Sequence, residues 1–170
     1  WFRQTAIRIL GDRKDQTSVP AFRTLLNQET GQVALEALWA INASGGFSEA
    51  VALEGLAHRD PHVRAWSIRI ACDDFEVSEP IAHQLALLSR SEPNVQVRSQ
   101  LASSARRVSG HIALTMVENL LTHQEDIADV HIPLLLWWAV EAKADTDRVT
   151  VLTMVRKREV WNSPLFQKHI

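Results

Sequence analysis

The chain has 170 residues, a size that fits one domain, and its 46% hydrophobic and 22% charged composition is ordinary for a globular protein with a buried core. A formal net charge of −2 argues against a protein that grips nucleic acid mainly by neutralising phosphates. The single cysteine, Cys72, excludes an internal disulfide bond and leaves the redox compartment open.

Apolar residues recur at helical spacing from a series of starting points about 30 residues apart. From each of the first five starts, apolar or small side chains follow at plus four and at plus seven or eight, as expected for a helix with one buried face. The starts are Phe2, Val33, Val63, Val97, Val130 and Val160, separated by 31, 30, 34, 33 and 30 residues. The sequence therefore predicts one helical unit repeated along the chain, with the sixth copy incomplete.

A further helical segment precedes each of these stripes after the first. We expect these first helices at residues 19–27, 47–57, 78–90, 111–122 and 147–156, with breakers such as Ser44-Gly45-Gly46 between successive helix pairs. No stretch has the pattern of a strand. The prediction is a single all-α domain over residues 1–170, an α-α superhelix of about five helix pairs.

The stretch Asp60-Pro61-His62-Val63-Arg64 contains a helix start, because aspartate is a good N-cap and proline suits the first helical position. This run, and Glu92-Pro93-Asn94-Val95-Gln96-Val97-Arg98, resemble the start of the second helix in HEAT repeats. The resemblance implies a HEAT or armadillo-like solenoid. Ala34 and His131 stand where an arginine would be expected, so we do not expect a continuous arginine–aspartate ladder.

More narrowly, residues 2–13 and 132–138 resemble the HEAT-repeat segment of large membrane-bound dehydrogenases of planctomycete-type bacteria. In that family the segment joins a dehydrogenase-like propeller to a cytochrome c domain. The resemblance implies an accessory domain of an exported or periplasmic protein. No Cys-x-x-Cys-His occurs in the chain, so neither haem attachment nor redox chemistry carries over, and no cofactor is expected.

Two tryptophans lie off the predicted buried stripe, on one face of adjacent second helices. Trp39 and Trp66 stand six and three residues after the starts at Val33 and Val63. Exposed tryptophan beside arginine is enriched in binding hot spots, so we predict a partner-binding groove. Its residues are Trp39, Trp66, Arg8, Arg69, Glu36 and Arg107, with Asp12, Asp73 and Gln100 on the same face. If the register were shifted by one residue, both tryptophans would instead pack between repeats.

Other groups have structural explanations. Trp137 and Trp138 fall on the predicted buried stripe, so we expect both in the core. His58, Asp60 and His62 span a helix boundary, which favours a solvated turn over a metal site. The acidic pairs Asp73-Asp74 and Glu125-Asp126 lie at helix boundaries, where carboxylates cap backbone N–H groups or favour the positive end of a helix dipole.

No nucleophile, phosphate-binding or metalloprotease motif appears, and Cys72 has no histidine close in sequence, so we expect a buried, inert thiol and no catalysis.

The predicted function is a non-catalytic scaffold that binds a protein segment or a neighbouring domain. The chain begins inside a helical pattern, so we expect a fragment of a larger protein. The first alternative is an accessory domain of an exported dehydrogenase whose active site lies elsewhere. The second is a HEAT-like nucleic-acid-binding protein similar to the alkylpurine DNA glycosylases, which the net charge disfavours. The longest apolar run, residues 132–140, is too short for a membrane span.

Overall fold

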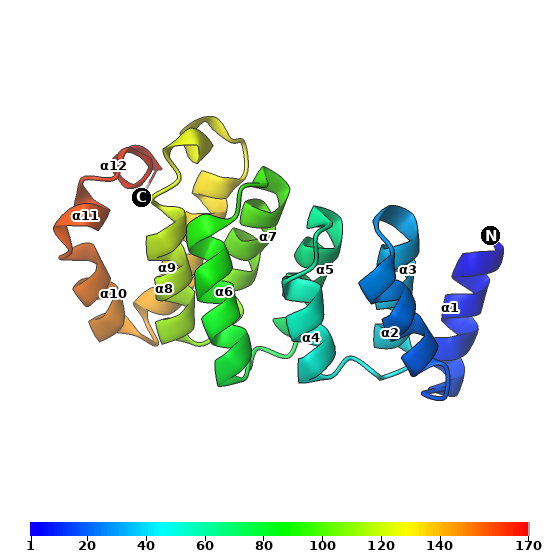
Figure 1. Cartoon of the computed structure of the whole chain (residues 1–170). Helices are drawn as coiled ribbons and strands as arrows, with labels where there is room; N and C mark the ends of the chain where they lie inside the picture. Colours follow the sequence, from blue (N-terminus) through cyan, green and yellow to red (C-terminus); the bar gives the residue numbers. More distant parts are fainter. Residues whose placement is uncertain (170) are drawn as a thin grey trace. The chain divides into compact units, whose positions relative to one another are not determined.

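Every regular element in the described part of the chain is a helix. The computed structural model describes residues 1–169, and the all-α prediction is confirmed because this range contains no strand (Figure 1). Its helices are α1 (Phe2–Arg13), α2 (Val19–Gln28), α3 (Gly31–Ala43), α4 (Glu49–Leu56), α5 (Pro61–Ala71), α6 (Glu79–Ser91), α7 (Val95–Ala105), α8 (Gly110–Leu120), the 3-10 helix η1 (Gln124–Ala128), α9 (Ile132–Ala144), α10 (Arg148–Val155), α11 (Arg158–Trp161) and α12 (Pro164–His169).

The chain divides into two compact units, an N-terminal unit of residues 1–70 and a C-terminal unit of residues 71–170. The helices agree closely with the sequence pattern in both of them. The second helices α3, α5, α7 and α9 begin at Gly31, Pro61, Val95 and Ile132, each within two residues of the predicted start. The single-domain organisation of residues 1–170 stays a prediction.

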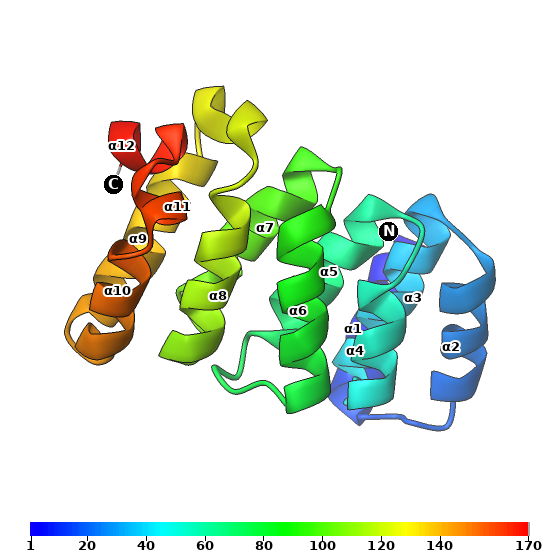
Figure 2. The ribbon, with the colours of Figure 1, turned by 60° about the vertical axis from the view of Figure 1, so that its left-hand side comes forward.

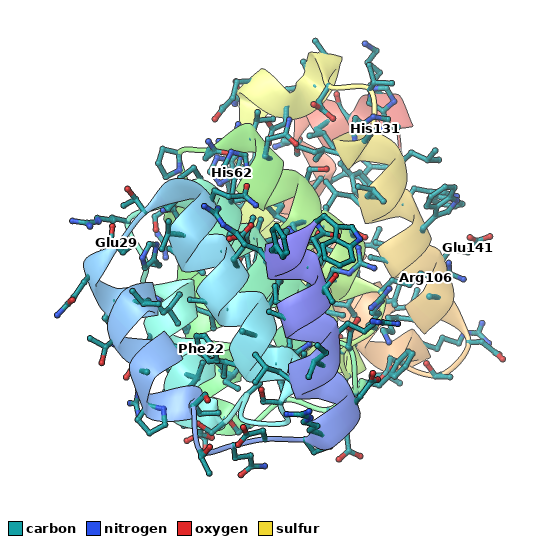
Figure 3. All side chains as sticks on the ribbon, turned by 90° about the vertical axis from the view of Figure 1, so that its right-hand side faces the viewer. Phe22, Glu29, His62, Arg106, His131 and Glu141 are labelled. Atoms are coloured by element: carbon teal, nitrogen blue, oxygen red, sulfur yellow. The ribbon has the colours of Figure 1, made fainter. Side chains whose placement is uncertain are left out.

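The core of the N-terminal unit lies between the first and second helices. Helix α3 packs against α1 and α2, and α2 contacts α4. Phe22 of α2 packs against this core, and Glu29 lies in the turn that leads from α2 to α3 (Figure 3). The buried core residues are Leu26, Ala34, Ala37, Leu38, Ile41, Val51 and Val63. In α3 the buried residues include Ala37 and Ile41 of the predicted stripe. Val33, the predicted start of that stripe, is 40% exposed.

Helix α1 does not bury the stripe that the sequence predicts for it. None of its residues is buried, and Phe2 is 82% and Ile9 39% exposed. The contact of α1 with α3 leaves these apolar side chains open to solvent. The prediction of a buried face for the first stripe is therefore wrong, because burial of one helix requires covering neighbours as well as periodicity.

The C-terminal unit has two rows of helices. Helices α6, α8 and α10 form one row, and α7 and α9 lie beside each other in the second (Figure 2). The predicted stripe of α7 is confirmed, since Val97, Leu101, Ser104 and Ala105 are all buried. Helix α9 departs from the prediction, because Leu134, Trp137 and Trp138 are 47%, 38% and 41% exposed.

The buried face of α9 is instead formed by Ile132, Leu136, Ala139 and Val140. The buried stripe thus begins at Ile132 rather than at Val130, two residues later than predicted. A shift of two residues turns a helical face by about 200°. The expectation of core positions for Trp137 and Trp138 is wrong for this reason. The 3-10 helix η1, which sequence periodicity did not reveal, occupies the preceding connection.

Side chains from one turn bind the end of the preceding first helix in the N-terminal unit. His58 is buried, with its Nε2 2.9 Å from the carbonyl oxygen of Leu26, and Arg59 donates to the carbonyl of Gln28 at 2.7 Å. Nδ1 of His58 accepts from the N–H of Asp60 at 3.0 Å. Nε2 therefore carries the proton, because a carbonyl oxygen can only accept. The prediction of a solvated turn is wrong for His58.

Similar bonds recur in the C-terminal unit. Nε2 of His123 lies 3.0 Å from the carbonyl oxygen of Ser89, and Asn119 donates to the carbonyl of Ala86 at the same distance. Ser163 donates to the carbonyl of Leu121 at 2.9 Å. The last carbonyls of a helix have no partner within that helix, so His123 and Ser163 complete the ends of α6 and α8, whereas Asn119 binds a carbonyl one turn before the end of α6.

A buried ion pair fixes η1 against the start of α7. Arg98 donates from Nε and Nη2 to the two carboxylate oxygens of Asp126 at 2.7 and 2.6 Å, and the two residues are 3% and 1% exposed. Nη1 donates to the carbonyls of Glu92 and Pro93 at 3.0 Å. The hydrogen bonds to Asp126 raise the pKa of Arg98. Asp126 lies in the first turn of η1, at the helix boundary that the sequence predicted, and its carboxylate pairs with Arg98.

We expect Gly55→Ala to destabilise the N-terminal unit by roughly 1–3 kcal/mol, because overpacking a closed helix contact outweighs the gain in helix propensity. A Cβ at Gly55 of α4 would overlap the hydroxyl of Ser67 and lie 2.9 Å from its Cβ. Urea denaturation measures the loss. Gly11→Ala is the matched control, since its Cβ would meet Ala43 at an ordinary 3.5 Å. A Gly55→Ala variant that Ser67→Gly does not restore would contradict this explanation.

A second expectation concerns pH. Partial burial of Asp60 opposes its ionisation, but N–H groups of Gly31, His62 and Val63 donate to its carboxylate and lower its pKa overall. The distances to the first two nitrogens are 2.6 and 2.8 Å. Because the folded-state pKa is depressed, this stabilisation is present above the unfolded pKa of about 3.9 and is lost as pH falls through the folded pKa.

Asp60→Asn should therefore lower the free energy of unfolding by about 1 kcal/mol at pH 7, and the difference from wild type should shrink below about pH 4. Denaturation across this pH range is the measurement. The exposed Asp12 supplies a control as Asp12→Asn. A difference for Asp60→Asn that is constant with pH would show that charge on this carboxylate does not matter.

Candidate functional site

Trp39 and Trp66 form the centre of the candidate site in the N-terminal unit. Trp39 comes from α3 and Trp66 from α5, and their rings meet edge to face with centroids 5.1 Å apart and an interplanar angle of 77°. Trp66 is 36% exposed, whereas Trp39 is half-buried. The sequence left two alternatives for these tryptophans, exposure on one face or packing between repeats. The structure has features of both, because the two indoles pack on each other and that of Trp66 reaches solvent.

An open groove of about 410 Å³ runs beside this pair. Three second helices contribute its walls, with Gln4 and Ile7 from α1, Trp39 and Asn42 from α3, and Trp66 and Ile70 from α5. Each helix supplies two residues three or four positions apart, the spacing that places side chains on one helical face. The sequence pattern identified the two tryptophans but missed the other four residues, which this spacing from the tryptophans could have indicated.

The indole Nε1–H of Trp39 is buried and has no hydrogen-bond acceptor within residues 1–169. A buried donor without an acceptor loses the hydrogen bond that water would give it, at a cost of about 1–3 kcal/mol. Edge-to-face packing with Trp66 offsets part of that cost, since such pairs contribute about 0.5–1.5 kcal/mol beyond their buried area. The arrangement is therefore held by ring packing rather than by polar contacts.

The predicted charged residues are only partly brought together. The Arg69 guanidinium lies over the Trp66 ring, 5.3 Å from its centroid, and in the described chain no carboxylate pairs with it. Arg8 is exposed on α1. Glu36 is already engaged, because it accepts from Arg3 at 3.2 Å and from Gln32 at 2.8 Å.

Arg107 belongs to the C-terminal unit, where it forms an ion pair with Asp73. Asp73 follows the end of α5, and the N-cap of the next helix, α6, is Ser78, so the prediction that Asp73 caps a helix is wrong. In the same region Cys72 is fully buried, and burial raises the pKa of its thiol to about 12. A thiol with this pKa is overwhelmingly protonated at neutral pH, so Cys72 is a poor nucleophile.

His58, Asp60 and His62 are the tightest group of histidine and acid in the sequence. Both ring nitrogens of His58 are used in hydrogen bonds, one with the carbonyl of Leu26 and one with the N–H of Asp60, so its role is structural. Among residues 1–169 no group of three or more His, Cys, Asp or Glu side chains is placed to hold a metal ion. Over the same range, no helix is both long enough and apolar enough to cross a membrane.

In comparisons with known proteins, no family model, no curated protein and no solved structure matches this chain.

Proposed function

We propose that this chain is a non-catalytic interaction module built from HEAT-like helical repeats, and that the groove beside Trp39 and Trp66 binds a segment of a protein partner. The observation that carries the proposal is the edge-to-face tryptophan pair in the wall of an open groove, with the Arg69 guanidinium stacked on the outer ring. Tryptophan and arginine are the residue types most enriched at the centres of protein interfaces.

Two repeating features support the repeat assignment. The second helices recur about every 30 residues, as the starts of α3 and α5 at Gly31 and Pro61 illustrate. Polar contacts recur with a similar separation in sequence, 32 residues for His58 with Leu26 and 34 residues for His123 with Ser89. In repeat proteins each unit contacts its neighbours in the same way, so equivalent bonds reappear once per repeat.

The groove suits a peptide better than a rigid small molecule. Its walls are mostly apolar, through Ile7, Ile70 and the two indoles, while Gln4 and Asn42 offer amide groups that can donate and accept hydrogen bonds. An extended peptide presents both apolar side chains and backbone N–H and C=O groups. The resemblance to a dehydrogenase-associated segment would make the partner another domain of the parent protein, and the reaction of that parent would take place elsewhere.

The test begins with selection of a 15-residue peptide that binds the wild-type protein from a displayed library. Trp66→Ala should weaken binding of that peptide by about 2 kcal/mol or more, roughly 30-fold in Kd. The free energy of unfolding should fall by a smaller amount, about 1 kcal/mol, because the edge-to-face contact with Trp39 is lost. Fluorescence anisotropy and urea denaturation give the two quantities. Trp1→Ala, at an 87% exposed tryptophan of the same unit, should leave both unchanged.

Two outcomes would count against the proposal. A large loss of stability in Trp66→Ala with unchanged peptide affinity would mean that the tryptophan pair serves packing alone. Tight binding of duplex DNA with a steep dependence on salt would favour the nucleic-acid alternative, because counterion release accompanies phosphate contacts.

A further inference from the structure

The C-terminal unit has a second groove, between α7 and α9, with a different lining from the Trp39–Trp66 groove. Gln96, Ser99, Gln100 and Ser103 of α7 form one wall. These residues stand at helical spacing, so amide and hydroxyl groups alternate along one face over about 10 Å. The volume of this α7–α9 groove is about 300 Å³.

The opposite wall is apolar and carries an exposed indole. Leu134 and Trp138 of α9 are 47% and 41% exposed, and both line the groove. His131, just before α9, lies at one end of the groove. Figure 3 places Glu141 and Arg106 at the other end of α9 from His131, and neither residue lines the groove.

The charged groups closest in sequence to the groove already bind other parts of the protein. Arg98 is the one charged residue within α7, and it is buried in its ion pair with Asp126. Asp129 accepts from the N–H groups of His131 and Ile132, both at 2.8 Å, and these bonds lower its pKa. The lining thus offers no lysine, arginine, aspartate or glutamate to a ligand.

We propose that the α7–α9 groove binds a neutral saccharide. An amide or hydroxyl side chain can donate and accept at once, as every sugar hydroxyl does, so the α7 wall can pair with hydroxyls without requiring charge. Trp138 and Leu134 supply an apolar face for the C–H groups of a pyranose ring. A few polar groups that fix orientation beside an apolar wall are the usual composition of a small-ligand site.

Gln100 is held for this role. Its Nε2 donates to the hydroxyl of Ser104 at 3.0 Å, which leaves the amide oxygen and the second N–H for a ligand. The length of the polar row matches two to three pyranose rings. An acidic sugar, a phosphate or a charged peptide would find no counter-ion in the lining, so the site should discriminate against charged ligands.

The experiment titrates the full chain with cellotriose, maltotriose, xylotriose and mannotriose by isothermal titration calorimetry. At least one should bind with a Kd of about 1 mM or tighter, and Trp138→Ala should weaken it at least tenfold, the size expected for loss of one stacked ring. Gln100→Ala should also weaken it. Trp137→Ala is the matched control, because Trp137 is the adjacent residue, is 38% exposed and does not line this groove.

Trp138→Phe provides a second variant that retains an aromatic face and should keep part of the affinity. Thermal unfolding confirms that each variant is folded. The proposal is overturned if none of the four sugars binds at 10 mM, if Trp137→Ala weakens binding as much as Trp138→Ala, or if trigalacturonate binds more tightly than the neutral sugars. Binding of the uncharged, end-capped peptide acetyl-Gly-Ser-Gly-Thr-Gly-amide in their place would overturn the proposal by identifying a peptide site.

Discussion

The carbonyl groups at the end of an α-helix have no partner within that helix, and here many of them are bound by side chains from a later turn. His58 and Arg59 bind the last turn of α2, and His123 binds the last turn of α6. Each bond joins the end of one first helix to the turn that follows the next first helix of the same unit. The turn after α4 thus binds the end of α2, and the turn after α8 binds the end of α6.

The two grooves each lie between second helices, and the register of these helices decides which side chains meet there. In the N-terminal unit the register brings Trp39 of α3 against Trp66 of α5. In the C-terminal unit it places Trp138 of α9 across from the polar face of α7. The two surfaces differ in chemistry, since one contains a tryptophan pair with a stacked arginine and the other an uncharged row of amides and hydroxyls. The two proposed sites therefore call for chemically different ligands.

The sequence predicted the helices well because proline, glycine and N-capping residues mark helix ends locally, as Asp60-Pro61 does for α5. It predicted the buried face poorly in α9, where the stripe begins at Ile132 rather than at Val130, so that Trp138 is exposed. Both the expected and the observed stripes of α9 contain enough apolar residues to form a core. Packing against α7 and α8 decides between them, and that information is not local. The buried pair of Arg98 and Asp126 was missed for the same reason.

Hydrogen exchange of the His58→Ala variant tests most directly whether side chains of one turn hold the preceding helix end. Amide exchange in residues 25–31, at the end of α2, should rise by about tenfold, because loss of a bond of roughly 1.4 kcal/mol lowers the local opening free energy by that amount. His62→Ala is the matched control, since His62 is exposed near the same turn and at the start of α5 (Figure 3). Unchanged exchange in residues 25–31, with a rise confined to the turn around residue 58, would contradict the account.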